Sequence, residues 1–106
     1  MSEQHHLIYI TTENKTEAVE IGKQLVEKRL AACVNIIEHM TSFYWWAGKV
    51  EEGQETVLIA KTKASLIKEL TEAVKTLHSY DCPCVVVLPI EGGNPDFLHW
   101  ITTETK

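Results

Sequence analysis

Hydrophobic residues recur along the chain with two different spacings. Short runs rich in β-branched and aromatic residues, such as His6 to Thr12 (HLIYITT), are typical of strands. Apolar residues three or four positions apart, such as Ala18, Ile21 and Leu25, predict one face of a helix. The two patterns together predict strands at 6–12, 33–37, 42–46, 49–63 and 85–88, and helices at 15–30, at about 66–77 and from 95 onward.

Capping signals mark where these helices begin. Asn14 stands three residues before Glu17, which is the arrangement of a capping box at the start of the first helix. Ser65 is placed to cap the second helix. Asn94, followed by Pro95, is expected to open the last helix, because proline is favoured in the first turn.

The apolar face of the first helix includes two residues of another kind. Gly22 lies near the middle of this face, where a missing side chain would let the helix approach a sheet closely. Arg29 is predicted to project onto the same face near the end of the helix. The helix dipole favours a cation there, and the aliphatic stem of arginine can cover apolar surface.

The order of the predicted elements defines the fold class. Strand, helix, strand, strand, helix and strand in succession form the split βαβ pattern of ferredoxin-like domains. We therefore predict an α+β fold, a ferredoxin-like βαββαβ antiparallel sheet with an extra C-terminal helix, in a single domain of residues 1–106. Right-handed crossovers put both helices of such a fold on the same face of the sheet.

The opposite face of the predicted sheet needs another cover. The segments 7–10, 57–60 and 85–88 are continuously apolar, which is typical of strands buried on both faces. One short C-terminal helix cannot cover a whole sheet face, and monomers rarely expose large apolar patches. The pattern therefore predicts that partner subunits cover this face, without specifying their number.

An aromatic run precedes the predicted hairpin turn at Ala47-Gly48. Phe43, Tyr44, Trp45 and Trp46 would be exposed on a two-stranded arm that projected alone. Docking on a neighbouring subunit would bury these rings, and Trp and Tyr are enriched at interfaces. The alternative is a local aromatic cluster within one subunit.

Composition and charge restrict the partners. The formal net charge is −5, and such an acidic surface repels nucleic-acid phosphate, so we expect no nucleic-acid partner. The N-terminal residues lack the basic start and apolar run of a signal peptide, and no apolar stretch has the length of a membrane span. A cytoplasmic location without membrane partners is expected, and three cysteines fit reduced thiols better than a disulfide framework.

Four residues are the best candidates for metal ligands. Cys33 begins a strand, His78 ends a helix, and Cys82-Pro-Cys84 leads into the last strand. Residues two apart in extended backbone face the same side, so both thiols of the pair can meet one ion. Thiolate and imidazole ligands together suit copper(I) or zinc. In the alternative interpretation, Cys33 is a small buried residue, His78 is a helix C-cap, and the cysteine pair fills a turn.

The adjacent residues His5 and His6 are a weaker candidate. They would provide a surface handle for a metal ion if both side chains were accessible. A frayed terminus is the favoured interpretation, because the first residues of a domain are often poorly ordered.

Several motifs, in matching order and spacing, resemble those of the CutA family of divalent-cation tolerance proteins. The resemblance extends over nearly the whole chain and includes the segments 30–35 (LAACVN), 42–49 (SFYWWAGK), 61–62 (KT), 78–80 (HSY), 88–90 (LPI) and 97–100 (FLHW). It implies a ferredoxin-like homotrimer in which hairpins and C-terminal segments join the subunits. It also implies a role in tolerance of divalent metals, especially copper.

Five further residues match positions that the family tends to keep, namely Lys49, Glu51, Lys61, Tyr80 and Trp100. The resemblance places Tyr80 and Trp100 near a cleft between subunits, and Glu55 and Lys61 are expected to pair across strands. Lys49 follows the aromatic hairpin turn. Packing and cross-strand pairing account for these residue types, so structural roles are favoured for all five.

Two positions depart from the family pattern. The family usually has His-Pro-Tyr where this chain has His78-Ser79-Tyr80, and Pro-Glu where it has Pro83-Cys84. That glutamate is among the residues proposed to line the family's metal-binding cleft. Cys84 therefore replaces a hard oxygen ligand with a soft sulfur ligand.

The sequence supports a non-catalytic, metal-binding homotrimer, with copper as its expected ion. No Ser-His-Asp order, His-Glu-x-x-His motif or convincing carboxylate pair indicates an enzyme. One alternative is a trimeric regulator, similar to PII proteins, that binds a small anion through Lys49, Lys61 and the N-terminus of the last helix. The other alternative is an assembly scaffold for another protein.

Overall fold

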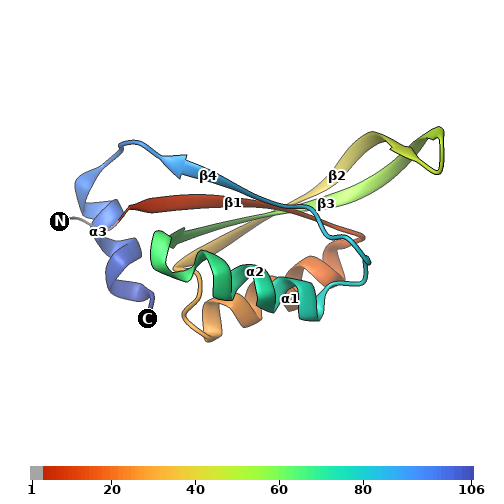
Figure 1. Cartoon of the computed structure of the whole chain (residues 1–106). Helices are drawn as coiled ribbons and strands as arrows, with labels where there is room; N and C mark the ends of the chain where they lie inside the picture. Colours follow the sequence, from red (N-terminus) through yellow and green to blue (C-terminus); the bar gives the residue numbers. More distant parts are fainter. Residues whose placement is uncertain (1–3) are drawn as a thin grey trace.

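Eight elements follow one another along residues 4–106, the part of the chain that this computed structural model describes (Figure 1). Residues 1–3, which begin the segment considered above for a signal peptide, lie outside the described residues. The elements are β1 (His5–Thr12), α1 (Lys15–Glu27), β2 (Cys33–Trp46), β3 (Lys49–Lys63), the 3-10 helix η1 (Ala64–Leu66), α2 (Ile67–Leu77), β4 (Val85–Ile90) and α3 (Pro95–Glu104).

The strands form one four-stranded antiparallel sheet in the order β2-β3-β1-β4. Helices α1 and α2 lie side by side on the same face of this sheet, and the outer parts of β2 and β3 extend beyond it as a hairpin arm (Figure 1). Helix α3 packs against β1 and β3 at the end of the sheet where β1 begins. The predicted α+β βαββαβ order with an extra C-terminal helix is confirmed.

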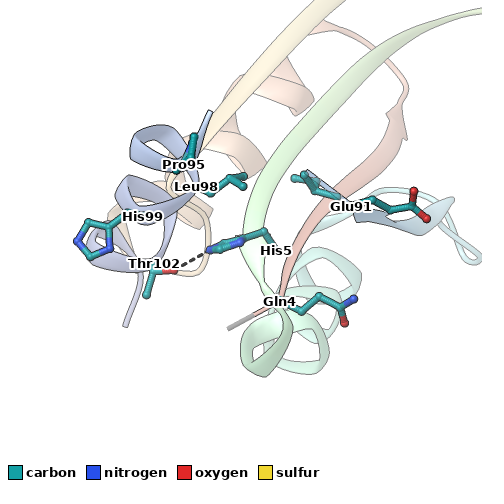
Figure 2. A pocket seen from close by; sticks show the side chains of 8 residues that line it. Gln4, His5, Glu91, Pro95, Leu98, His99 and Thr102 are labelled. Carbon is teal, nitrogen blue, oxygen red and sulfur yellow. Dashed lines mark hydrogen bonds between the residues drawn. The ribbon is translucent and has the colours of Figure 1, made fainter. Parts of the chain in front are cut away.

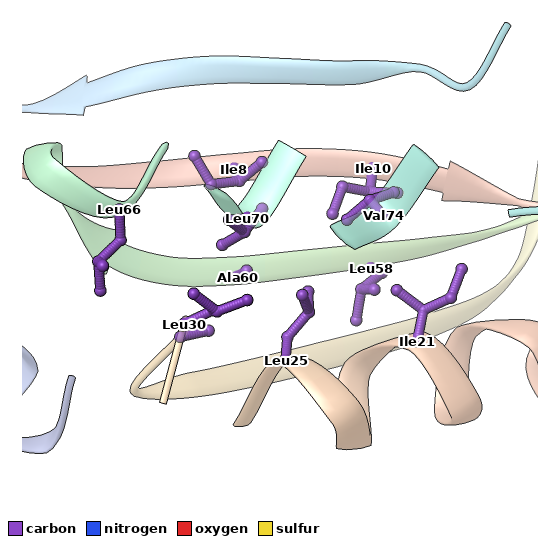
Figure 3. Packing of buried hydrophobic residues seen from close by; sticks show 11 residues of the cluster. Ile8, Ile10, Ile21, Leu25, Leu30, Leu58, Ala60, Leu66, Leu70 and Val74 are labelled. Atoms are coloured by element: carbon purple, nitrogen blue, oxygen red, sulfur yellow. The ribbon is translucent and has the colours of Figure 1, made fainter. Parts of the chain in front are cut away.

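The core lies between the sheet and the two helices. Ile8 and Ile10 point from β1 to this side, and the strand register places Ala60 and Leu58 directly opposite them on β3. The helices contribute Leu25 from α1 and further aliphatic side chains from α2, and the cluster has almost no exposed surface (Figure 3). The period of two along the strands therefore explains which residues fill the core.

The opposite face of the sheet, here called the open face, is also apolar. Alternation in β1 puts Leu7 and Tyr9 on this face, where they pair with Leu88 and Val86 of β4. Val86 is 49% exposed and Leu88 is 45% exposed in the single chain. Most of the face has no helix over it (Figure 1). An apolar surface of this kind is expected to be covered by another chain.

Helix α1 begins where the sequence predicts and ends earlier. The side chain of Asn14 accepts a hydrogen bond from the backbone N–H of Glu17 at 2.9 Å, which confirms the predicted cap. The last helical residue is Glu27 rather than residue 30, because Arg29 adopts a left-handed φ of 61°. The N–H of Leu30 then bonds to the Leu25 carbonyl, as in a Schellman-type ending.

The Arg29 guanidinium is exposed and donates to a Glu104 carboxylate oxygen at 2.8 Å. Gly22 does make the predicted close approach. A Cβ atom at this position would lie 3.0 Å from a methyl of Val34 and 3.1 Å from a methyl of Leu58.

Two further boundaries differ from the predictions. The segments 33–37 and 42–46 form one continuous strand, β2, since a bulge between Ile37 and Met40 absorbs the polar residues. His39 takes a left-handed φ of 65° within this bulge. Ser65 does not occupy the cap position of α2, because it lies inside the 3-10 turn that precedes this helix.

Replacing Asn14 with alanine is expected to lower the free energy of unfolding by about 1 kcal/mol, because an N–H at the start of α1 loses its partner. Urea denaturation at fixed protein concentration measures the difference. Asn14→Ser is the matched control, since serine also accepts this bond. Equal stabilities of the alanine variant and the unchanged protein would contradict the assigned cap.

Candidate functional site

The four predicted metal ligands occupy two separate parts of the chain. His78 ends α2, and the loop from His78 to Cys84 connects this helix to β4. Cys82 is exposed on this loop, and Cys84 is half-buried immediately before β4. Cys33 is half-buried at the start of β2. All three cysteines are free thiols.

Strand register shows how far Cys33 lies from the loop. One row across the sheet contains Cys33, Lys61, Leu7 and Leu88. Cys84 precedes Leu88 by four positions, or about 13 Å along the strand, and three strand spacings across the sheet add about 14 Å. Cys33 and Cys84 of one subunit therefore do not share an ion in this conformation.

The structure accordingly does not assemble the set of four within one chain. Among residues 4–106, no group of three or more His, Cys, Asp and Glu side chains is placed to hold a metal ion. Of the four, Cys82 and Cys84 are the two that stand only two positions apart in the sequence.

His78 lies at the centre of a hydrogen-bonded cluster formed by α1, α2, β1 and β3. Its Nε2 is 2.7 Å from the backbone carbonyl oxygen of Thr11, and the N–H of Tyr80 donates to its Nδ1 at 3.0 Å. The Tyr80 ring packs on the imidazole with a centroid separation of 4.6 Å. The Tyr80 hydroxyl donates to a Glu55 carboxylate oxygen at 3.1 Å. Both nitrogens of His78 are thus already engaged.

Glu17 holds the same loop from the side of α1. Its carboxylate accepts hydrogen bonds from the backbone N–H groups of Ser79, at 2.9 Å, and Glu13, at 3.0 Å. Burial raises the pKa of the Glu17 carboxyl, but the hydrogen bonds that it accepts from Glu13 and Ser79 outweigh this effect and lower the pKa below its ordinary value. Glu17 is therefore ionised at neutral pH.

Tyr80 is held in its protonated form. Burial raises the pKa of its phenol, and the hydrogen bond to Glu55 and the charges of neighbouring carboxylates raise it further, well above the ordinary value. A folded-state pKa above the unfolded one contributes stability that is complete below about pH 10 and is lost as the pH rises beyond it.

Spectrophotometric titration can test this environment. Folded Tyr80 keeps its proton, so it should add almost nothing to the rise in phenolate absorbance between about pH 8 and about pH 11. Tyr80→Phe is therefore expected to leave this rise almost unchanged. In denaturant, where Tyr80 titrates normally, the same substitution should remove its share of the signal. A proportional loss in the folded protein would contradict the assigned bond to Glu55.

Glu55 and Lys61 do not pair with each other, contrary to the sequence-based expectation. Both residues belong to β3, so they cannot form a cross-strand pair. Glu55 accepts from Tyr80, and the Lys61 ammonium donates to the Asn35 side-chain oxygen at 2.7 Å. The Lys61 nitrogen also lies 3.8 Å from the sulfur of Cys33.

The predicted anion-binding groups are also far apart in one chain. Lys49 begins β3 at the tip of the arm, and Lys61 lies near the other end of the same strand. Their separation of 12 residues corresponds to about 40 Å of strand. A site that used both cations would need more than one subunit.

The aromatic residues separate into two groups. Phe43, Tyr44, Trp45 and Trp46 are exposed on the arm, with Trp45 75% exposed. Trp100 lies on α3, where it packs on Phe97 with a ring centroid separation of 5.4 Å. In one chain Trp100 and Tyr80 therefore belong to different regions, because α3 and the loop after α2 lie at opposite ends of the sheet (Figure 1).

A cavity of about 900 Å³ lies away from the predicted metal ligands (Figure 2). It is formed where β1 begins, where β4 ends and along α3. The interpretation of His5 and His6 as a frayed terminus is wrong, because both belong to β1. His5 lines the cavity and its Nε2 is 2.7 Å from the Thr102 hydroxyl. His99 also lines the cavity, and no sequence motif indicated that the two histidines would line one cavity.

The element order and the strand order define a ferredoxin-like α+β chain with an open sheet face and a long hairpin arm. Residues 6–104 match the family described as CutA1 divalent ion tolerance protein. The chain belongs to this family, as the resemblance predicted. No helix within residues 4–106 is both long and apolar enough to cross a membrane.

Individual relatives agree with this assignment. The mouse protein CutA is 47% identical over 92% of this chain, which spans only 55% of the mouse protein's length. The crystal structure of CutA1 from Oryza sativa has a TM-score of 0.95 and 43% identity, covering 97% of this chain and 94% of that one. The periplasmic divalent cation tolerance protein CutA from Archaeoglobus fulgidus has a TM-score of 0.93 and 45% identity, covering 96% and 99% of the two chains.

Proposed function

We propose that this chain forms a homotrimer that binds a soft metal ion, with copper as its physiological ion, and that it acts in metal tolerance without catalysing a reaction. The observation that carries this proposal is the Cys82-Pro83-Cys84 pair, which presents two free thiols on an accessible loop. Family membership supports a role connected with divalent ions.

The donor set fits copper in its reduced state. Thiolates are soft ligands that select copper(I) over hard cations such as magnesium and calcium. Cys82 is exposed and provides an entry path for the ion, while Cys84 is half-buried beside the folded sheet. The other two predicted ligands cannot reach this ion in the conformation of a single chain. Cys33 could join only from another subunit, and His78 only after one of its ring nitrogens releases its hydrogen bond, so neither belongs to the proposed site.

The open face and the hairpin arm support the assembly. Apolar side chains of β1, β3 and β4 cover this face, and the arm exposes four aromatic rings. Neighbouring subunits would bury both surfaces, and three is the number that the family resemblance implies. The free thiols of all three cysteines are consistent with a reducing compartment, and we propose the cytoplasm.

Competition for copper(I) with a chromogenic chelator tests the proposed site, using reduced protein purified without a histidine tag. Cys82→Ser and Cys84→Ser are each expected to weaken binding at least about 100-fold, the upper end of the effect of losing an outer-shell partner. Cys33→Ser is the matched control and should bind as the unchanged protein does. Unchanged affinity in both loop variants would remove the site.

A further inference from the structure

The His78 imidazole has no exposed side-chain surface and is held between two backbone groups. The Thr11 carbonyl oxygen can only accept a hydrogen bond, so the Nε2 that faces it carries the proton. The Tyr80 N–H can only donate, so the Nδ1 that faces it is unprotonated. These two partners assign a neutral ring with its proton on Nε2.

The ring thereby joins the end of β1 to the start of the loop that leads to β4. Beside it, Ser79 is bonded to Glu17 of α1, and the Tyr80 hydroxyl reaches Glu55 of β3. The first residues of the loop are consequently attached to three different elements. Two positions after Tyr80 comes Cys82, and Val85 begins β4. The position of Tyr80 therefore limits where both loop thiols can lie.

We infer that His78 is a positioning residue, which fixes the loop carrying Cys82 and Cys84 through the bond between its Nδ1 and the Tyr80 N–H. This inference rests on the proposed function for the role of the two thiols. It differs from the sequence-based prediction of His78 as a ligand, because both ring nitrogens hold backbone groups and neither faces an open coordination position.

Two substitutions separate the two bonds of the ring. In His78→Asn, the amide oxygen takes nearly the position of Nδ1 and can accept from Tyr80, while the bond to Thr11 is lost. In His78→Gln, the longer amide can donate to the Thr11 carbonyl, while the acceptor for Tyr80 is lost. If the inference is correct, only the asparagine variant keeps the loop in place.

Alkylation of the metal-free protein by iodoacetamide, followed by mass spectrometry of each cysteine, tests this expectation. His78→Gln should accelerate alkylation of Cys84 about tenfold, the factor expected from losing one hydrogen bond, whereas His78→Asn should change it less than about twofold. Cys33, at the other end of the sheet, is the internal control. Equal effects of the two substitutions, or equal acceleration at Cys33, would overturn the inference.

A measurement on the unchanged protein covers the case in which the variants fail to fold. Nitrogen-15 NMR of the His78 ring should show a neutral imidazole protonated on Nε2, and the Tyr80 amide should be protected from hydrogen exchange. A ring protonated on Nδ1, or a freely exchanging Tyr80 amide, would overturn the inference. Neither experiment uses metal. Both results can therefore be interpreted even if the protein proves not to bind copper.

Discussion

Replacing Val86 and Leu88 together with glutamate is expected to convert the assembly into separate, folded chains. Both side chains lie on the open face and are about half exposed in one chain, so the substitutions cost a single chain little. In the proposed trimer they would bury carboxylates without partners, at a cost of several kcal/mol for each. The dissociation constant should therefore rise by more than about 1000-fold, since each 1.4 kcal/mol corresponds to tenfold.

Light scattering and sedimentation measure this change as a fall in mass from three chains to one, with circular dichroism confirming the fold. The matched control replaces Val19 and Val26 of α1, which are exposed apolar residues on the helical side, with glutamate. This control adds the same charge and should keep the mass of three chains. An unchanged mass in the Val86 and Leu88 variant would show that the open face is not the interface.

Truncating Leu58 to alanine is expected to have the largest effect on stability, a loss of about 3 kcal/mol in the free energy of unfolding. Leu58 has no exposed surface and lies on β3 directly beneath α1. One of its methyl groups is 3.1 Å from the position that a Cβ of Gly22 would occupy, so the helix is already seated closely on this side chain. Since the neighbouring groups are tightly packed, they cannot collapse fully into the cavity.

Thermal and urea unfolding at one protein concentration measure the loss, because the stability of an assembly depends on concentration. Val19→Ala is the matched control on the exposed surface and should change stability by less than about 0.5 kcal/mol. A comparably small change in the Leu58 variant would contradict the central place of this side chain in the core.

The sequence predicted the fold because the helices have a regular apolar spacing and the strands are short apolar runs between turn signals. The same reasoning missed features that depend on single backbone angles. Arg29 ends α1 in a left-handed conformation, and His39 allows β2 to continue past its polar residues. Neither is a glycine, so composition offered no signal for a positive φ at these positions.

The candidate site was predictable only in part. The sequence singled out His78, Cys82 and Cys84 as candidates, and the structure places all three on the loop between α2 and β4. Residue types could not show that the imidazole uses both nitrogens on backbone groups, because these partners come from β1 and from the loop itself. Ligand chemistry alone grouped Cys33 with these residues. The strand register shows that Cys33 lies too far from Cys84 to share an ion with it in one subunit.

X-ray absorption at the copper edge, recorded on reduced protein loaded with less than one copper(I) ion per chain, tests the proposed metal site most directly. If Cys82 and Cys84 hold the ion, sulfur neighbours should dominate the spectrum, and they should disappear in the Cys82→Ser, Cys84→Ser double variant. A first shell of nitrogen and oxygen alone in the unchanged protein would contradict the account.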